Sequence, residues 1–162
     1  MKRLVVTSAL VVTTASLFLM CDELQNEQND TTTQLTQSEN EQTTRIRTAS
    51  GLEYEIVQEG SGDTPRPGNM LTVHYTGWLN SNGEPGQEFD SSVRRHKPYV
   101  FKIGLGQVIK GWDEGVMGMK VGEKRRLFIP SHLAYGPRSV GPVIRANSNL
   151  IFDVELLKIT VL

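Results

Sequence analysis

The chain has 162 residues, 38% of them hydrophobic, and its formal net charge is −1. Residues 22–44 hold six Asp or Glu and no Lys or Arg, whereas the chain from residue 45 onward holds 15 Lys or Arg and 12 Asp or Glu. A net charge of +3 with both signs mixed excludes recognition of nucleic acid by charge alone. Cys21 is the single cysteine, which excludes a disulfide within the chain.

The first 21 residues have the pattern of an export signal. Lys2 and Arg3 are followed by a mostly apolar run from Leu4 to Met20, interrupted by Thr and Ser. This run is short for a stable membrane span, so a transmembrane anchor is the less favoured alternative.

Cys21 directly follows the apolar run, where a bacterial lipoprotein carries its acylated cysteine. The preceding Met20 is bulkier than the small residue usual at that position. Two interpretations stay open: Cys21 is lipidated and anchors the protein to a membrane, or it is a free thiol within a signal cleaved elsewhere. Under both we expect export, to a periplasmic or cell-surface location.

Residues 22–48 are rich in Gln, Asn, Thr and Glu and contain no aromatic residue. Such a composition cannot bury enough apolar surface to fold. We therefore predict a disordered acidic tether over residues 22–48 and one folded domain over residues 49–162.

The domain begins with the alternation typical of strands. Leu52–Val57 predicts the first strand, and a second runs from Leu71 to Leu79 after a long turn rich in Gly and Pro. His74 falls on the face opposite the apolar residues of that second strand, which indicates a surface histidine rather than a ligand. The turn-forming residues of Asn80–Gln87 predict a loop, and Pro98–Gly104 predicts another strand.

A short helix is predicted around Trp112. Val108, Trp112 and Val116 recur at intervals of four residues, so they share one helix face that carries the indole inward. Gly118 predicts the C-terminal end of this helix.

Beyond the helix, the basic triplet Lys124–Arg126 predicts a solvent-exposed start of a strand. Ser131–Asn149 predicts a long loop, and Leu150–Ile159 predicts the last strand. Several antiparallel strands with one short helix make the fold class α+β.

The common catalytic groups are not arranged for chemistry in this domain. His74, His96 and His132 lie in different predicted elements without metal-ligand spacing, and the cysteine lies outside the domain. Gly104 and Gly106 lack the third glycine of a dinucleotide-binding motif. The sequence therefore predicts no cofactor and no metal, and leaves a collection of aromatic and aliphatic residues with a few polar groups.

Five short motifs, in this order, resemble the FKBP-type peptidyl-prolyl cis-trans isomerases. They are Val73–Gly77 (VHYTG), Phe89–Ser92 (FDSS), Val108–Gly115 (VIKGWDEG), Ala134–Gly136 (AYG) and Phe152–Leu156 (FDVEL). The resemblance covers roughly residues 51–161 and implies a twisted antiparallel half-barrel sheet wrapped around one short helix. The chain departs from the family pattern in a longer Asn80–Gln87 loop and in Arg145 and Ala146, which stand where two prolines are usual.

The resemblance also implies a pocket for proline, lined mainly by rings and branched side chains. The matching positions are Tyr75, Phe89, Asp90, Tyr99, Val108, Ile109, Trp112, Tyr135, Ile144 and Phe152. Trp112 is expected to form the pocket floor, and Asp90, a buried carboxylate in the family, to orient Tyr75. The Ile109 N–H and the Tyr135 hydroxyl are expected to bind substrate carbonyls.

The activity that the resemblance implies is isomerisation of X-Pro bonds during protein folding, without covalent or acid/base chemistry. Such bonds exchange over roughly 10–100 s unaided. Expected partners are proline-containing polypeptides and macrolides such as tacrolimus and rapamycin, and no nucleic acid is expected. Two alternatives stay open: a chaperone or adhesin-like module that holds proline segments without turnover, and a structural domain with a vestigial pocket.

Overall fold

The computed structural model describes residues 44–161. The predicted export signal, Cys21 and residues 22–43 of the predicted tether lie outside the described residues. Within residues 44–161 no helix is both long and apolar enough to cross a membrane.

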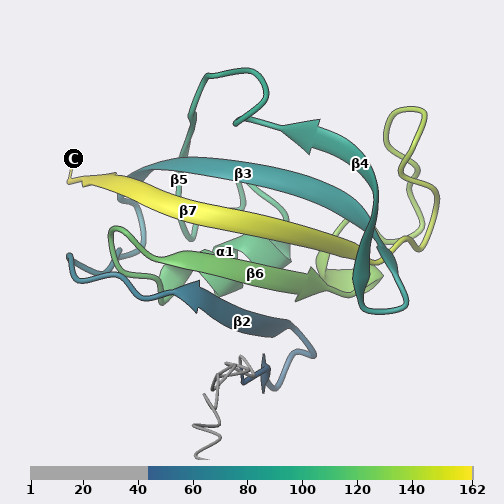
Figure 1. Cartoon of the computed structure of the whole chain (residues 1–162), viewed down its shortest axis with the longest axis horizontal. Helices are drawn as coiled ribbons and strands as arrows, with labels where there is room; N and C mark the ends of the chain where they lie inside the picture. Colours follow the sequence, from purple (N-terminus) through teal and green to yellow (C-terminus); the bar gives the residue numbers. More distant parts are fainter. Residues whose placement is uncertain (1–43, 162) are drawn as a thin grey trace, which may run out of the picture. The chain divides into compact units, whose positions relative to one another are not determined.

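Seven strands form one antiparallel sheet (Figure 1). Its path runs β1-β2-β6-β7-β3-β4, and β5 also pairs with β3. The strands are β1 (Ile46–Arg47), β2 (Glu53–Gln58), β3 (Met70–Ser81), β4 (Glu84–Ser91), β5 (Tyr99–Lys102), β6 (Lys124–Ile129) and β7 (Leu150–Thr160). The α-helix α1 (Lys110–Met117) and the short 3-10 helix η1 (Ser131–Leu133) complete the fold.

Strand β3 organises the sheet because it pairs with three other strands. One edge bonds to β7 from Met70 to Leu79, while the other edge is shared between β5 in its first half and β4 in its second half. Between these halves the backbone of Tyr75 bonds to Ser92: the Ser92 N–H donates to the Tyr75 carbonyl (2.9 Å), and the Ser92 hydroxyl accepts from the Tyr75 N–H (2.7 Å). The chain leaves the sheet at this break and returns as β5.

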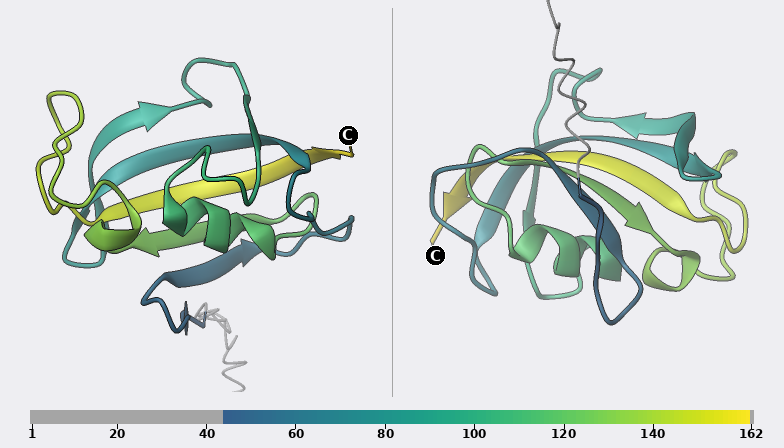
Figure 2. Two further views of the ribbon diagram at one scale, coloured as in Figure 1. Left: turned by 180° about the vertical axis from the view of Figure 1, so that it is seen from behind. Right: turned by 60° about the horizontal axis from the view of Figure 1, so that its bottom comes forward.

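Helix α1 lies against the concave side of the sheet, which curves over it (Figure 2). The buried apolar side chains lie between the two, with Trp112 and Val116 contributed by the helix. Gly111 and Gly115 allow a close approach to β6: a Cβ on Gly111 would lie 2.5 Å from the Ile129 side chain, and one on Gly115 would lie 2.8 Å from Leu127. The predicted α+β fold, a half-open antiparallel sheet around one short helix, is confirmed.

The basic triplet of β6 differs from the expected exposed strand start. The Arg125 side chain is only 6% exposed and forms an ion pair with Glu123, which is 2% exposed, at 2.6 Å. Its guanidinium also donates to the carbonyls of Gly115 (2.8 Å) and Gly118 (3.3 Å) at the end of α1. Arg125 is buried because a helix C-terminus offers unpaired carbonyls and a negative partial charge to a cation.

Helix α1 starts later than the spacing of apolar residues predicts. Ile109 is its N-cap residue, so Val108 precedes the helix rather than sharing a face with Trp112. The Asp113 carboxylate accepts hydrogen bonds from the N–H groups of Gly104 and Gly106, both 2.9 Å, and so holds the preceding loop against the first turn. Gly118 is the C-cap residue, as predicted.

The segment Asn80–Gln87 is a hairpin rather than a loop. Strand β3 continues to Ser81 and β4 begins at Glu84, so the connection consists of Asn82 and Gly83 alone. Both residues have positive φ, 56° and 92°, as tight two-residue hairpins require. An Asn-Gly pair strongly predicts a hairpin, and the prediction of a loop did not take it into account.

The described chain also contains a strand before the expected start of the domain. Ile46 pairs with Tyr54 in β1–β2, and the preceding Arg45 places its guanidinium 3.7 Å from the centre of the Phe128 ring. Ile46 and Val57 are exposed on these edge strands.

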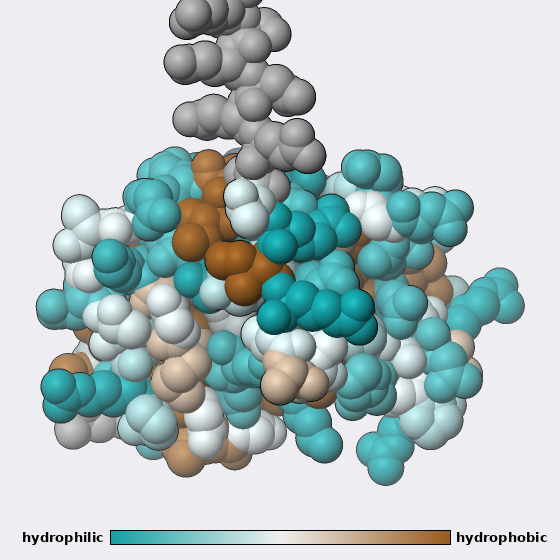
Figure 3. Space-filling view, turned by 90° about the horizontal axis from the view of Figure 1, so that it is seen from below, coloured by the Kyte–Doolittle hydropathy of each residue, from teal (hydrophilic) through white to brown (hydrophobic). Residues whose placement is uncertain are grey.

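Viewed from below in Figure 3, the surface is mostly hydrophilic, with a hydrophobic patch near its centre.

Candidate functional site

All ten residues expected at the site line one cavity of about 580 Å³. They come from separate parts of the chain: β3 and β4, the start of β5, the loop before α1, α1 itself, the segment after η1, and β7. Six further residues line the same cavity and were not expected from the sequence: Gly106, Gln107, Val140, Gly141, Pro142 and Val143.

Trp112 lies at the centre of an aromatic cluster. Its indole, 4% exposed, meets the rings of Tyr75 and Phe152 edge to face, at centroid distances of 5.1 and 5.3 Å. Tyr99 makes a third edge-to-face contact at 6.3 Å, and Phe101 lies 5.6 Å away. Such pairs stabilise the packing beyond the area they bury. A rigid ring therefore closes one side of the cavity.

Gly77 allows this cluster to form on β3. A Cβ at this position would lie 2.7 Å from the rings of both Phe89 and Phe152. These two rings meet edge to face at 5.5 Å because the glycine leaves room for them. The wall of the cavity next to Trp112 thus depends on the absence of a side chain at Gly77.

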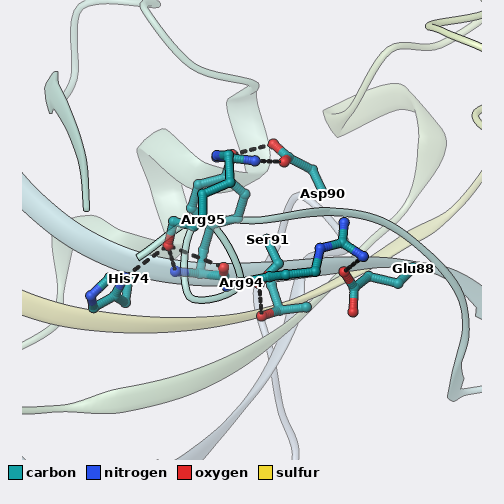
Figure 4. Close-up of polar contacts among 9 residues, drawn as sticks. His74, Glu88, Asp90, Ser91, Arg94 and Arg95 are labelled. Atoms are coloured by element: carbon teal, nitrogen blue, oxygen red, sulfur yellow. Dashed lines mark hydrogen bonds and ion pairs between the residues drawn. The ribbon is translucent and has the colours of Figure 1, made fainter. Parts of the chain in front are cut away.

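A polar network connects Tyr75 to the rim of the cavity (Figure 4). The Tyr75 hydroxyl donates a hydrogen bond to Asp90, and Arg95 forms an ion pair with the same carboxylate. Arg95 also donates to the Tyr75 hydroxyl at 3.2 Å. Next to this group, Arg94 pairs with Glu88 at 3.0 Å. The Tyr75 hydroxyl is thereby held by two charged partners.

Asp90 differs from expectation in its burial. Its side chain is 38% exposed, so the expected buried carboxylate is wrong for this chain. Asp90 reaches solvent because it lies near the end of β4, where the chain turns into the exposed loop that carries Arg95. Its negative charge is compensated by ion pairing with Arg95 rather than by burial.

Sequence reasoning did not identify Arg95 or Ser92 as part of the site. The Ser92 side chain is buried and its hydroxyl contacts the backbone of Tyr75 and, at 3.0 Å, the Nδ1 atom of His74. A basic residue five positions after Asp90 was the available signal for Arg95. That spacing becomes informative only once the intervening loop is known to fold back.

The two donors that were expected to bind substrate carbonyls, the Ile109 N–H and the Tyr135 hydroxyl, have no partner within residues 44–161. The Ile109 carbonyl accepts from the N–H groups of Trp112 (2.9 Å) and Asp113 (3.1 Å), whereas the Ile109 N–H forms no hydrogen bond among the described residues. The Tyr135 hydroxyl has no partner there either. Both donors are free to bind carbonyl oxygens.

The Tyr135 hydroxyl remains protonated at neutral pH. Burial raises its pKa above the ordinary value of 10.0, and the neighbouring Tyr99 adds to the rise. A raised pKa means that ionisation is displaced to still more alkaline solution. The hydroxyl is therefore a hydrogen-bond donor throughout the physiological range.

Ile144 closes the cavity from the loop between η1 and β7. It is 5% exposed and forms an isolated bridge with Val140, so the loop folds back on itself over residues 140–144. Arg145 and Ala146, which replace the usual prolines, are exposed. The departure from the family pattern therefore lies beside the cavity and not in its lining.

A second, smaller hollow of about 210 Å³ lies beside β3, β6 and β7. Its lining includes Lys124, Asp153 and Glu155, and it lacks the tryptophan floor. Charged walls of both signs do not suit an apolar ring. The larger cavity is therefore the candidate site for proline.

Comparisons with known proteins agree with this geometry. The sequence model of the family described as FKBP-type peptidyl-prolyl cis-trans isomerase matches residues 62–157. The chain is 54% identical over 110 residues to FK506-binding protein 1A of Neurospora crassa, covering 67% of this chain and 88% of that protein. It is 53% identical over 109 residues to the FK506-binding protein of Neisseria meningitidis serogroup B, covering 67% and 96%.

The fold is similar to the crystal structure of AtFKBP13, with a TM-score of 0.66 and 39% sequence identity over 72% of this chain and 99% of the other. The family match covers more than half of the chain and includes all ten expected cavity residues. The chain therefore belongs to the FKBP-type peptidyl-prolyl cis-trans isomerases, enzymes that interconvert the cis and trans forms of X-Pro peptide bonds.

Proposed function

We propose that the cavity over Trp112 is where this isomerase holds the proline of its substrate. The observation that carries the proposal is the combination of an aromatic floor with two unpartnered donors, the Ile109 N–H and the Tyr135 hydroxyl, in the lining of one cavity. The proline ring packs on the indole, and the donors bind carbonyl oxygens of the flanking residues.

The chemistry suits an apolar site. Resonance keeps the peptide bond planar, with a rotation barrier of about 18–20 kcal/mol. As the bond twists it loses resonance, and its carbonyl becomes less polar than in the planar form. An apolar cavity disfavours the polar planar form more than the twisted one, which lowers the barrier between them. Each tenfold gain in rate requires about 1.4 kcal/mol of such differential stabilisation.

Asp90 and Arg95 act on substrate through Tyr75 rather than by proton transfer. Both hold the Tyr75 hydroxyl, and the Tyr75 ring meets Trp112 edge to face at 5.1 Å. The network therefore positions one wall of the proline pocket. We assign Asp90 the role of a positioning residue.

The same cavity is proposed to bind macrolides. Two relatives at 54% and 53% identity are named for binding FK506, which is tacrolimus. The ten expected lining residues all face one cavity of about 580 Å³, which supports an apolar ligand of this kind, with rapamycin as a second.

Replacing Trp112 tests the assignment of the floor. Trp112→Leu keeps an apolar side chain but removes the flat surface, so kcat/KM for an X-Pro peptide and tacrolimus affinity should each fall about tenfold or more, or about 1.4 kcal/mol. The free energy of unfolding should fall less than with Trp112→Ala, a change that typically costs about 3–5 kcal/mol. Denaturant unfolding and a protease-free isomerisation assay measure the two effects.

Trp78 supplies the matched control, since it is the other tryptophan and does not line the cavity. Trp78→Leu should keep wild-type kcat/KM. Wild-type turnover by Trp112→Leu, or an equal loss in both variants, would place the proline site elsewhere.

The pH dependence tests the absence of proton chemistry. His74, His96 and His132 all lie outside the lining, and Tyr135 ionises only above its ordinary value of 10.0, so kcat/KM should be nearly flat from about pH 6 to 8. Tyr135→Phe and Asp90→Asn should lower kcat/KM partially and leave the profile flat. A bell-shaped wild-type profile that Asp90→Asn flattens would show that Asp90 transfers a proton.

We further propose that the protein is exported to a periplasmic or cell-surface location and anchored to a membrane through lipidated Cys21, with the acidic segment that follows as tether. The support is the charged and apolar pattern of residues 1–20 and the position of Cys21 at its end.

Intact-mass measurement of the protein from a membrane fraction tests the anchor. The expected mass corresponds to a chain that begins at Cys21 and carries acyl groups, and Cys21→Ser should release the protein from the membrane. A soluble mature chain that begins at another residue would contradict anchoring and leave export standing.

A further inference from the structure

Two chain segments that contribute to the cavity lining carry only positive charges. Residues 92–111 hold five Lys or Arg and no Asp or Glu, and residues 130–149 hold two and none. The remainder of the chain from residue 45 onward has the opposite balance, with eight Lys or Arg and 12 Asp or Glu. The positive charge of the domain is thus concentrated in the chain segments around one cavity.

Five of these seven cations form no ion pair within residues 44–161. Arg94 and Arg95 are paired with Glu88 and Asp90. Of the five others, Lys102 is half-buried in β5. The remaining four are exposed and form no ion pair among the described residues; we call them the basic rim, and they are Lys97, Lys110, Arg138 and Arg145.

The basic rim lies next to the cavity lining along the chain. Lys97 is two residues before Tyr99, and Lys110 directly follows Ile109. Arg138 and Arg145 stand on either side of residues 140–144, all five of which line the cavity. The one carboxylate of the lining, Asp90, is already neutralised by Arg95. Along the chain, the lining is therefore flanked by four exposed cations without ion pairs, against one carboxylate without an ion pair directly next to a lining residue, Asp113, which bonds to backbone N–H groups.

The floor of the cavity consists of aromatic rings, so these cations do not contact the proline ring bound there. An extended chain advances about 3.3–3.6 Å per residue, so the residues two or three positions from a bound proline reach beyond the lining to its surroundings. Unpaired cations there attract acidic side chains and oppose basic ones, and they also steer charged ligands during approach.

We propose that the basic rim makes this isomerase selective for prolines in acidic segments, with Asp or Glu within a few residues of the X-Pro bond. The proposal rests on the cavity being the isomerase site. The rim supplies the selection by charge, and the aromatic floor supplies the recognition of proline itself.

The test uses the full-length protein and three peptides that share a Leu-Pro core and carry two Glu, two Gln or two Lys residues on each side. At low salt, kcat/KM for the Glu peptide should exceed that for the Lys peptide by about tenfold or more. The difference should vanish in about 1 M salt, where the Debye length is about 3 Å, compared with about 30 Å at 0.01 M. Equal kcat/KM for the two charged peptides at low salt would overturn the proposal.

Charge-changing variants assign the effect to the rim. Arg138→Glu combined with Arg145→Glu should bring the ratio of Glu to Lys peptide close to one, and the two Arg→Gln changes should give a ratio in between. Lys120→Glu combined with Lys158→Glu changes the net charge equally at exposed positions outside residues 92–111 and 130–149, and it should keep the wild-type ratio. An equal fall of the Glu-to-Lys peptide ratio in this control would overturn the role of the basic rim and show an effect of net charge alone.

Binding of the same peptides, measured by fluorescence anisotropy, distinguishes failure of the basic rim from failure of the proposed isomerase site. Preferential binding of the Glu peptide without its turnover would support the rim and contradict the proposed isomerase site. Turnover of all three peptides at one rate would support the site and overturn the rim.

Discussion

Helix α1 carries a tryptophan into the concave side of the sheet because two of its residues have no side chain. Gly111 and Gly115 face Ile129 and Leu127 of β6 so closely that a Cβ at either glycine would lie within 2.8 Å of a side-chain atom. The short distance between helix and sheet leaves the indole of Trp112 nearly buried, with one side toward the cavity. The pocket floor is therefore set by backbone packing rather than by the tryptophan alone.

Charge and apolar surface are kept apart in this domain, and the separation supports the mechanism. At the far end of α1, the buried Arg125 is satisfied by Glu123 and by two helix carbonyls, because a buried charge without such partners is strongly destabilising. At the cavity, Asp90 is satisfied by Arg95 and by the Tyr75 hydroxyl. The first network holds the end of α1 and the second holds the Tyr75 ring of the aromatic cluster.

Patterns of local sequence predicted five of the seven strands and the position of the helix, because each of these strands turns one face to the core; β1 and β4 were not predicted. The Asn82–Gly83 turn could also have been predicted, since both residues tolerate positive φ. The position of Val108 outside the helix could not have been predicted in this way. It depends on Asp113, which holds the loop before the helix by hydrogen bonds to Gly104 and Gly106, nine and seven residues earlier. The burial of Arg125 and the pairing of Arg95 depend on groups that only the folded chain brings together. The site residues came from resemblance to a family, not from periodicity.

The most direct test of the account is to follow the two indole N–H resonances of ¹⁵N-labelled protein during titration with a neutral X-Pro peptide. The Trp112 indole nitrogen is buried and has no hydrogen-bond partner within residues 44–161, and Trp78 lies outside the cavity lining. The account predicts a saturable shift of the Trp112 resonance, with the Trp78 resonance unchanged. A shift of Trp78 alone, or a stationary Trp112 resonance at a peptide concentration that saturates turnover, would contradict it.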